Sequence, residues 1–89
     1  MKTPILPVTI FPGSANLLVL RPISFGETGP VYYWELQDAA PGADPIRRAD
    51  GNVTMTAAQW NDWPAGDAPE LDEAYQLACV AQLLGLTPA

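Results

Sequence analysis

The sequence predicts an α+β domain: a small antiparallel sheet built from two β-hairpins, packed against a short tryptophan-bearing helix and a C-terminal helix. Three observations lead to this fold. Branched and aromatic residues fill two runs, residues 16–25 and 30–37, which a Gly-Glu-Thr-Gly turn separates. Asp50 and Gly51 form a typical tight turn between two further short runs. The last third has helical spacing and helix-capping residues.

Residues 1–15 are predicted to form an extended N-terminal arm, and residues 16–89 a single domain. The prolines of the arm hold it extended and remove backbone donors, so we do not expect it to join the sheet. They also interrupt the apolar run that an export signal needs. Ile5 and Leu6 have no obvious place in so small a core, which makes them candidates for attachment to a partner.

The first hairpin has one strand with a clear face for the core. Alternation along residues 30–37 puts Trp34 on the same face as Tyr32 and Leu36, and Tyr33 on the opposite face. Pro22 in the other strand indicates a bulge or a position at the sheet edge. In the second hairpin, centred on Asp50-Gly51, Val53 and Met55 are expected to face the core.

Thr56 and Gln59 form a capping box, so a short helix begins at Ala57 and ends before Pro64. Trp60 and Trp63 lie on one side of it. These two indoles have three interpretations. They cover the hairpins as part of the core, the reading favoured for so small a domain, or they form an exposed platform for a ligand. In a mixed arrangement, one indole faces inward and the other lies at a subunit contact.

Asp67 is a second N-cap candidate, and a longer helix is expected over about residues 68–84, where Gly85 stops it. This helix is apolar around most of its circumference. Cys79 is expected in the core. Three small residues suit close packing against the sheet, namely Ala74, Ala78 and Ala81. Three larger ones are left for a partner, namely Leu71, Tyr75 and Leu83.

Composition indicates a chain that buries apolar surface against another protein. Charged residues make up 16% of the 89 residues, against roughly 25% in a typical soluble domain, while 48% are hydrophobic. The net charge of −6 disfavours nucleic acid, which would repel the chain. Its apolar runs fall short of the ~20 residues that a membrane helix requires. We therefore expect protein partners and self-association, with no nucleic acid and no membrane.

Site chemistry is missing from the sequence. The chain has no histidine and one cysteine, which removes the commonest general base, the commonest metal ligand and a cysteine-rich zinc site. The adjacent Asp72 and Glu73 point about 100° apart on a helix and suit a helix N-terminus better than catalysis. We therefore expect no enzymatic activity, no catalytic residue, no cofactor and no metal.

Residues 54–86 carry a pattern that resembles small tailed-bacteriophage proteins. The pattern is a threonine-rich cap, an aromatic residue, a second tryptophan, a short Gly-Asp linker and a helix with Cys-Val-Ala before Leu-Gly-Leu. The matching residues are Thr56, Trp60, Trp63, Gly66, Asp67, Tyr75, Cys79, Val80, Ala81, Leu84, Gly85 and Leu86. The resemblance implies a virion accessory protein, either a capsid decoration or cement subunit or a neck or tail component, present in the host cytoplasm during assembly.

The functional prediction is therefore a non-enzymatic virion structural protein that acts by protein–protein assembly. Its interface candidates are Ile5, Leu6, Tyr33, Trp60, Trp63, Leu71, Tyr75 and Leu83. The alternative is a small soluble binding module that presents tryptophan and tyrosine side chains, among them Trp60, Trp63 and Tyr33, to a peptide or a glycan. A platform of that kind requires both indoles to be open to water.

Overall fold

The computed structural model describes residues 1–63 and 69–89, with side chains in the second range from residue 72 onward. Within these residues the chain forms four strands and two helices. They are β1 (Lys2–Ile10), β2 (Gly13–Phe25), β3 (Pro30–Asp38), β4 (Ile46–Thr54), α1 (Ala57–Asn61) and α2 (Pro69–Leu83).

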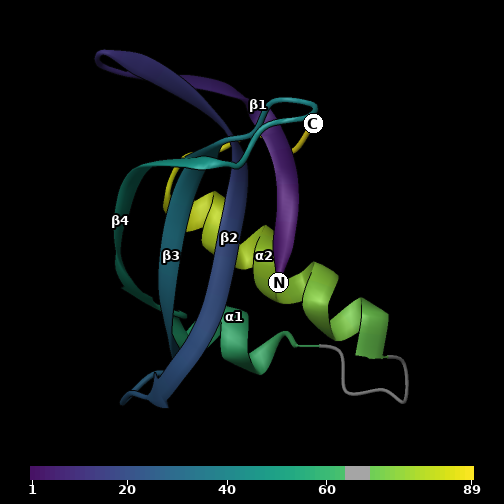
Figure 1. The fold of residues 1–89 in the computed structure, drawn as a ribbon. Coiled ribbons are helices and arrows are strands. Elements are labelled where there is room, and N and C mark those ends of the chain that lie inside the picture. The colour runs from purple at the N-terminus through teal and green to yellow at the C-terminus, as the bar shows by residue number, and fades with distance from the viewer. Residues whose placement is uncertain (64–68) are drawn as a thin grey trace.

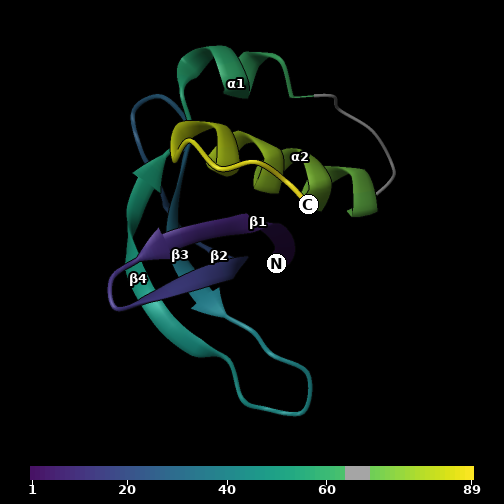
Figure 2. The ribbon, with the colours of Figure 1, turned by 90° about the horizontal axis from the view of Figure 1, so that it is seen from above.

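The strands form one antiparallel sheet in the order β1-β2-β3-β4, so each strand pairs with its neighbour in the chain. Figures 1 and 2 show both helices on the same side of this twisted sheet. The predicted α+β class is confirmed: an antiparallel sheet is covered by a short helix bearing tryptophan and by a C-terminal helix.

The hairpin of β2 and β3 forms as predicted, with Leu20 opposite Trp34. The register shifts between Pro22 and Ser24, which confirms the irregularity expected at this proline. β1 pairs with β2 only as far as Val19, so Pro22 lies beyond that pairing and its missing N–H breaks no bond to β1.

The prediction of a separate N-terminal arm is wrong, because its residues form β1 at the edge of the sheet. The prolines are tolerated at an edge, where the register also shifts between Pro4 and Val8. The C-terminal tail lies along the outer side of β1: the Leu6 amide donates to the Thr87 carbonyl at 2.8 Å, and the Ala89 amide donates to the Pro4 carbonyl at 3.2 Å. Ile5 is buried, with 2% of its surface exposed.

The second predicted hairpin is also wrong. Asp50 and Gly51 lie inside the single strand β4, which pairs along β3 from Asp38 to Val31. Gly51 stands opposite Trp34, so the glycine accommodates the indole instead of reversing the chain. Local turn propensity is outweighed here by pairing with a neighbouring strand.

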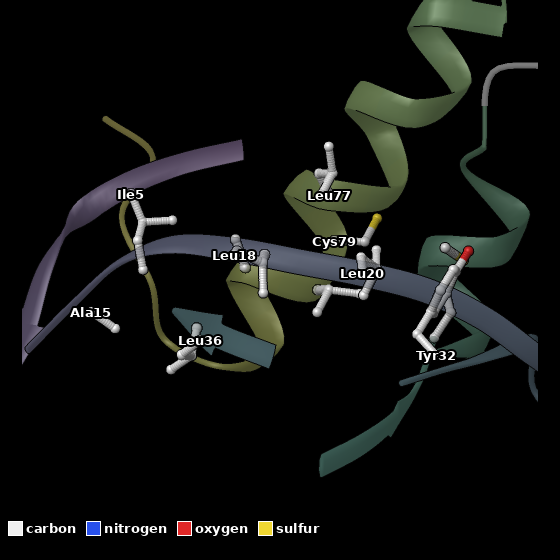
Figure 3. Close-up of a cluster of buried hydrophobic side chains, with 11 residues drawn as sticks. Ile5, Ala15, Leu18, Leu20, Tyr32, Leu36, Leu77 and Cys79 are labelled. Carbon is white, nitrogen blue, oxygen red and sulfur yellow. The ribbon is translucent and has the colours of Figure 1, made fainter. Parts of the chain in front are cut away.

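The hydrophobic core lies between the inner face of the sheet and α2 (Figure 3). Its buried residues are Ile5, Ala15, Leu18, Leu20, Tyr32, Leu36, Met55, Leu77, Cys79, Val80 and Ala81. Met55 and Cys79 are buried as predicted, whereas Trp34 and Val53 are half-buried and pack against the core from the expected face. The Tyr32 hydroxyl donates to Gln76 Oε1 at 2.6 Å, which joins the sheet to α2.

Local sequence signals set the helix ends. The capping box is present: Gln59 N donates to Thr56 Oγ1, and Thr56 N donates to Gln59 Oε1, both at 3.1 Å. At the end of α2, Gly85 has φ +70° and the Leu86 amide donates to the Ala81 carbonyl, as in a Schellman motif. The N-cap predicted at Asp67 lies outside the described residues. Among the described helices, none is long and apolar enough to cross a membrane.

The face of α2 that meets the sheet differs in part from the prediction. Leu77, Val80 and Ala81 are buried, but Ala74 and Ala78 are exposed. Ala74 and Ala78 line a shallow groove beside β1, together with residues that include Thr3 and Pro88. Leu77 and Val80, which bury more area than alanine, therefore pack in the core together with Ala81, the one predicted alanine that is buried.

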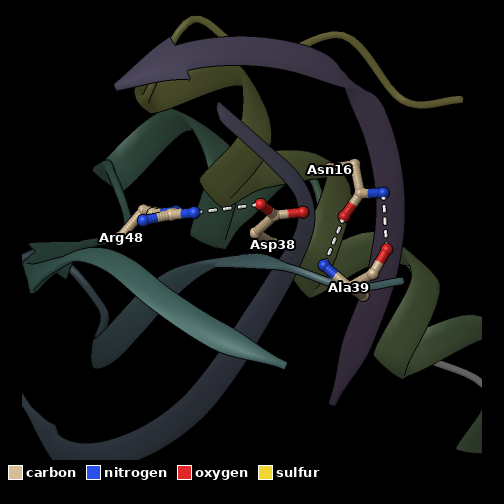
Figure 4. A network of polar contacts seen from close by, with 4 residues as sticks. All are labelled: Asn16, Asp38, Ala39 and Arg48. Atoms are coloured by element: carbon tan, nitrogen blue, oxygen red, sulfur yellow. Dashed lines mark hydrogen bonds and ion pairs between the residues drawn. The ribbon is translucent and has the colours of Figure 1, made fainter. Parts of the chain in front are cut away.

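Polar contacts join the strands at the end of the sheet where β3 leads into the loop before β4 (Figure 4). Asn16 and Ala39 exchange two hydrogen bonds, at 2.9 and 2.8 Å. Arg48 pairs with Asp38 at 3.2 Å. Its guanidinium lies over the backbone of Gly13, where an added Cβ would come within 2.7 Å of Arg48 Cζ.

Candidate protein-interaction surface

Four aromatic side chains form a continuous row, which we call the aromatic row: Phe25 of β2, Trp60 of α1, Trp63 just after α1, and Tyr75 of α2. Phe25 contacts Trp60 edge to face, with ring centroids 5.0 Å apart. Trp60 meets Trp63 in the same way at 5.5 Å, and Trp63 stacks on Tyr75 at 5.5 Å. Such pairs add to the stability that area burial provides.

Short-range signals place the middle of the row. The capping box starts α1 directly after Met55, which is fully buried, and so fixes where Trp60 emerges. The turn between β2 and β3 lies against α1: Thr28 Oγ1 donates to the Met55 carbonyl at 2.7 Å. A Cβ at Gly29 would lie 3.4 Å from that of Trp60. The turn therefore brings Phe25 to the tryptophan.

One end of the row is anchored between the helices. Trp63 Nε1 donates to Asp72 Oδ1 at 3.0 Å, and the Tyr75 hydroxyl donates to the Gln59 carbonyl. Gln59 Nε2 in turn donates to the Cys79 carbonyl at 3.2 Å. Burial is the main cause that raises the pKa of Tyr75, so its hydroxyl remains a donor at neutral pH. This end locks α1 onto α2.

The other end of the row is open to solvent. Phe25 is 64% exposed and Trp60 is 41% exposed, although both rings have an aromatic neighbour. A pair of large exposed aromatic side chains held in fixed positions is typical of a protein-binding surface, because such side chains bury large area at low entropic cost. The structure thus combines a hydrogen-bonded base with an accessible apolar tip.

Exposed acidic side chains lie on or next to the segments that build the row, but at different places: Asp62 lines the cleft between α1 and α2, and Glu73 lines the groove beside β1. Glu27 lies in the turn after Phe25, Asp62 caps the end of α1, and Glu73 lies on α2; all three are exposed. Residues 57–89 contain five acidic and no basic residues.

The other predicted interface residues are spread over the molecule. Ile5 is a core residue, so its assignment as an attachment residue is wrong. Leu6 is exposed on β1, and Leu83 is exposed beside a cleft of about 600 Å³ between α1 and α2. The Leu71 side chain lies outside the described residues. Trp60, Trp63 and Tyr75 are brought together in the aromatic row.

Tyr33 lies on the opposite face of the sheet from the helices. Its hydroxyl donates to Asp50 Oδ2 at 3.3 Å, and Arg21 Cζ lies 5.3 Å from its ring centroid. Its neighbour Tyr32 points into the core, and successive strand residues face opposite ways. Tyr33 therefore does not share a platform with the two tryptophans.

Sequence reasoning missed Phe25, the most exposed member of the aromatic row. The register shift after Pro22 changes which residues of β2 face which way, so alternation does not predict its orientation. The sequence does place Phe25 immediately before a Gly-Glu-Thr-Gly turn. Because this turn lies against the start of α1, the position of Phe25 next to the turn could have indicated that it lies near Trp60.

The described residues show no group of three or more His, Cys, Asp or Glu side chains placed to hold a metal ion. Cys79 is buried, and burial is the main cause that raises the pKa of its thiol, which keeps it protonated at neutral pH. Comparison of the chain with protein-family models, curated proteins and solved structures gives no match.

Proposed function

We propose that this chain is a non-enzymatic assembly protein of a tailed-bacteriophage virion, either a capsid decoration subunit or a neck or tail component. The observation that carries the proposal is the open end of the aromatic row, where Phe25 and Trp60 contact one another edge to face and are both exposed. Exposed aromatic side chains are enriched among the residues that contribute most to protein binding.

The resemblance in residues 54–86 supports the same proposal. Its aromatic positions, Trp60, Trp63 and Tyr75, are the ones that build the row. Gly85 takes the positive φ that ends α2. Part of the pattern therefore builds one surface of the molecule, which suits a protein that acts by binding, while Cys79, Val80 and Ala81 of the same pattern lie in the core.

The alternative, a soluble module that binds a peptide or a glycan, requires two open indoles. Trp63 is half-buried, and its N–H group is engaged by Asp72. Tyr33 lies across the sheet. These positions favour an assembly surface with one projecting aromatic pair over a flat platform of three rings.

Quantitative mass spectrometry of purified particles tests the proposal. Particles of the phage whose genome encodes the chain are purified and separated on a density gradient. We expect the chain to co-sediment with the major capsid protein at a constant ratio across the particle peak. Absence from the peak, or a ratio that varies from fraction to fraction, would overturn the proposal.

A further inference from the structure

One face of the sheet points away from the helices, since both described helices lie on its other side (Figures 1 and 2). Leu18 and Leu20 are buried in the core, so Val19 between them points outward, together with the residues paired directly opposite it. We call this surface the outer face. It consists of three rows across the strands: Pro4, Leu17, Gln37 and Arg47; Lys2, Val19, Glu35 and Asp50; and Arg21, Tyr33 and Asn52.

The outer face differs in charge from the chain as a whole. Three of the four basic residues lie on it, namely Lys2, Arg21 and Arg47, with two of the ten acidic residues, Glu35 and Asp50. Three cations and two carboxylates give this face a net charge of +1, whereas the chain carries −6. The excess negative charge is therefore absent from the outer face. It opposes contact between two such faces only through long-range repulsion, which salt screens.

Apolar and aromatic side chains occupy the middle of the outer face. Leu17 and Val19 on β2 and Tyr33 on β3 are half-buried, and these two strands are the central pair of the sheet. Arg21 Cζ lies 5.3 Å from the Tyr33 ring centroid. Two antiparallel sheets commonly pack face to face with their strands nearly aligned, which buries residues in such positions. A second sheet would therefore cover the middle of this face.

Opposite charges lie at the two ends of the central row. Lys2 lies on the edge strand β1, and Asp50 lies on the other edge strand, β4, with Glu35 opposite it on β3. Among the described residues Lys2 forms no ion pair. A twofold axis parallel to the strands, between β2 and β3, places β1 of each copy over β4 of the other. The outer face is thus complementary in charge to a second copy of itself, as a twofold interface requires.

We propose that two copies of the chain pack outer face to outer face about this axis and form a dimer. Each Lys2 pairs with the partner's Asp50 and Glu35, and each Arg21 lies over the partner's Tyr33. The inference does not depend on the proposed assembly function. The three rows comprise eleven residues, against roughly 20–30 on each side of a standard interface, so the dimer is weak and reversible.

The dimer leaves the aromatic row accessible. Trp60 lies on α1, on the side of the sheet that faces away from the second copy, and Phe25 contacts it there. Each dimer therefore presents two open aromatic ends. A larger assembly could bind both ends at once, which raises the overall affinity without any new contact.

Sedimentation velocity of the full chain over micromolar to millimolar concentrations tests for the dimer. Lys2→Glu and Glu35→Lys should each weaken self-association by about tenfold or more, because each makes two attractive contacts repulsive. An equimolar mixture of these two variants should restore the dimer, since the substituted side chains then face one another with opposite charge across the interface. Glu73→Lys is the matched control: it changes the net charge as Glu35→Lys does, but lies on α2, and should not weaken association.

Cross-linking tests the same contact without a substitution, so the test stays decisive if a variant fails to fold by circular dichroism. Lys2 is the only lysine of the chain. A carbodiimide joins a lysine amine to a carboxylate in direct contact with it. In a mixture of unlabelled and isotope-labelled chains, we expect mass spectrometry to find Lys2 of one copy linked to Glu35 or Asp50 of the other.

Three outcomes would overturn the inference. The first is a chain that stays monomeric throughout the concentration range. The second is a dimer that neither Lys2→Glu nor Glu35→Lys weakens, or a mixture of the two that stays monomeric. The third is a dimer that Trp60→Ala abolishes while Lys2→Glu leaves it intact, which would place the contact at the aromatic row. Each of these results is independent of whether the chain co-sediments with particles.

Discussion

Gly51 lies directly opposite Trp34 in the pairing of β3 with β4, and a Cβ added to Gly51 would come within 2.8 Å of Trp34 Cζ2. The indole thus occupies the space that a side chain would fill. This contact explains why an Asp-Gly pair that favours a turn is found in the middle of a strand.

Gly51→Ala should destabilise the domain by about 1–3 kcal/mol, the usual cost of overpacking, since the Trp34 ring must move. The denaturation midpoint in urea measures the change. Asn52→Ala is the matched control, because Asn52 is exposed on the same strand. In a Trp34→Leu background the cost of Gly51→Ala should disappear. If Gly51→Ala raises the denaturation midpoint, the Trp34 ring does not occupy the space where the added Cβ would lie.

Ile5→Ala should cost about 2–5 kcal/mol, the range for truncating a buried aliphatic side chain. Leu6→Ala should cost less than about 1 kcal/mol, because Leu6 is 52% exposed whereas Ile5 is 2% exposed. Thermal melts of the two variants give the comparison. Deletion of residues 1–6 should abolish the cooperative melt, since it removes part of β1. If the truncated chain melts at the same temperature as the full chain, the prediction of a separate N-terminal arm would be correct after all.

Trp63→Ala should cost about 2–4 kcal/mol, somewhat below the 3–5 kcal/mol typical of a fully buried aromatic. The indole is half-buried, yet the variant loses both the stack on Tyr75 and the bond to Asp72. Phe11→Ala, at an exposed aromatic, should change stability by less than about 0.5 kcal/mol. If chemical denaturation shows no difference between the two variants, the ligand-platform alternative gains support.

Stability should fall at alkaline pH because of Tyr32. Burial first, and the charge of Cys79 second, raise the pKa of Tyr32 from 10.0 to about 12. The contribution of this hydroxyl is fully present below pH ~10, and it is lost as pH rises toward ~12, because the unfolded chain releases the proton first. Tyr32→Phe should show a shallower loss over this window in denaturant titrations. Parallel pH profiles for the two proteins would contradict the assignment.

The aromatic row could be predicted only in part from the sequence. Trp60 lies on α1, whose start the capping box fixes, whereas Trp63 lies just beyond the end of that helix at Asn61, with its ring against Trp60. Phe25 and Tyr75 join them through contacts between elements distant in the chain, which no local spacing reveals.

The sequence by itself determined the features that depend on neighbours along the chain. These are the hairpin of β2 and β3, the start of α1 at Thr56, the end of α2 at Gly85 and the α+β class. Each follows from short-range effects such as alternation, capping and the freedom of glycine at positive φ. These effects act within a few residues, so they can be read without the fold.

The tertiary structure decided what depends on the free edges and on the shape of the core. β1 joins the sheet in spite of its prolines because an edge strand needs few donors and the C-terminal tail pairs with its outer side. β4 runs through Asp50 and Gly51 because β3 offers a complete pairing partner and Trp34 needs the space above the glycine. Pairing and packing between distant segments outweigh local propensity there, so only the assembled fold reveals them.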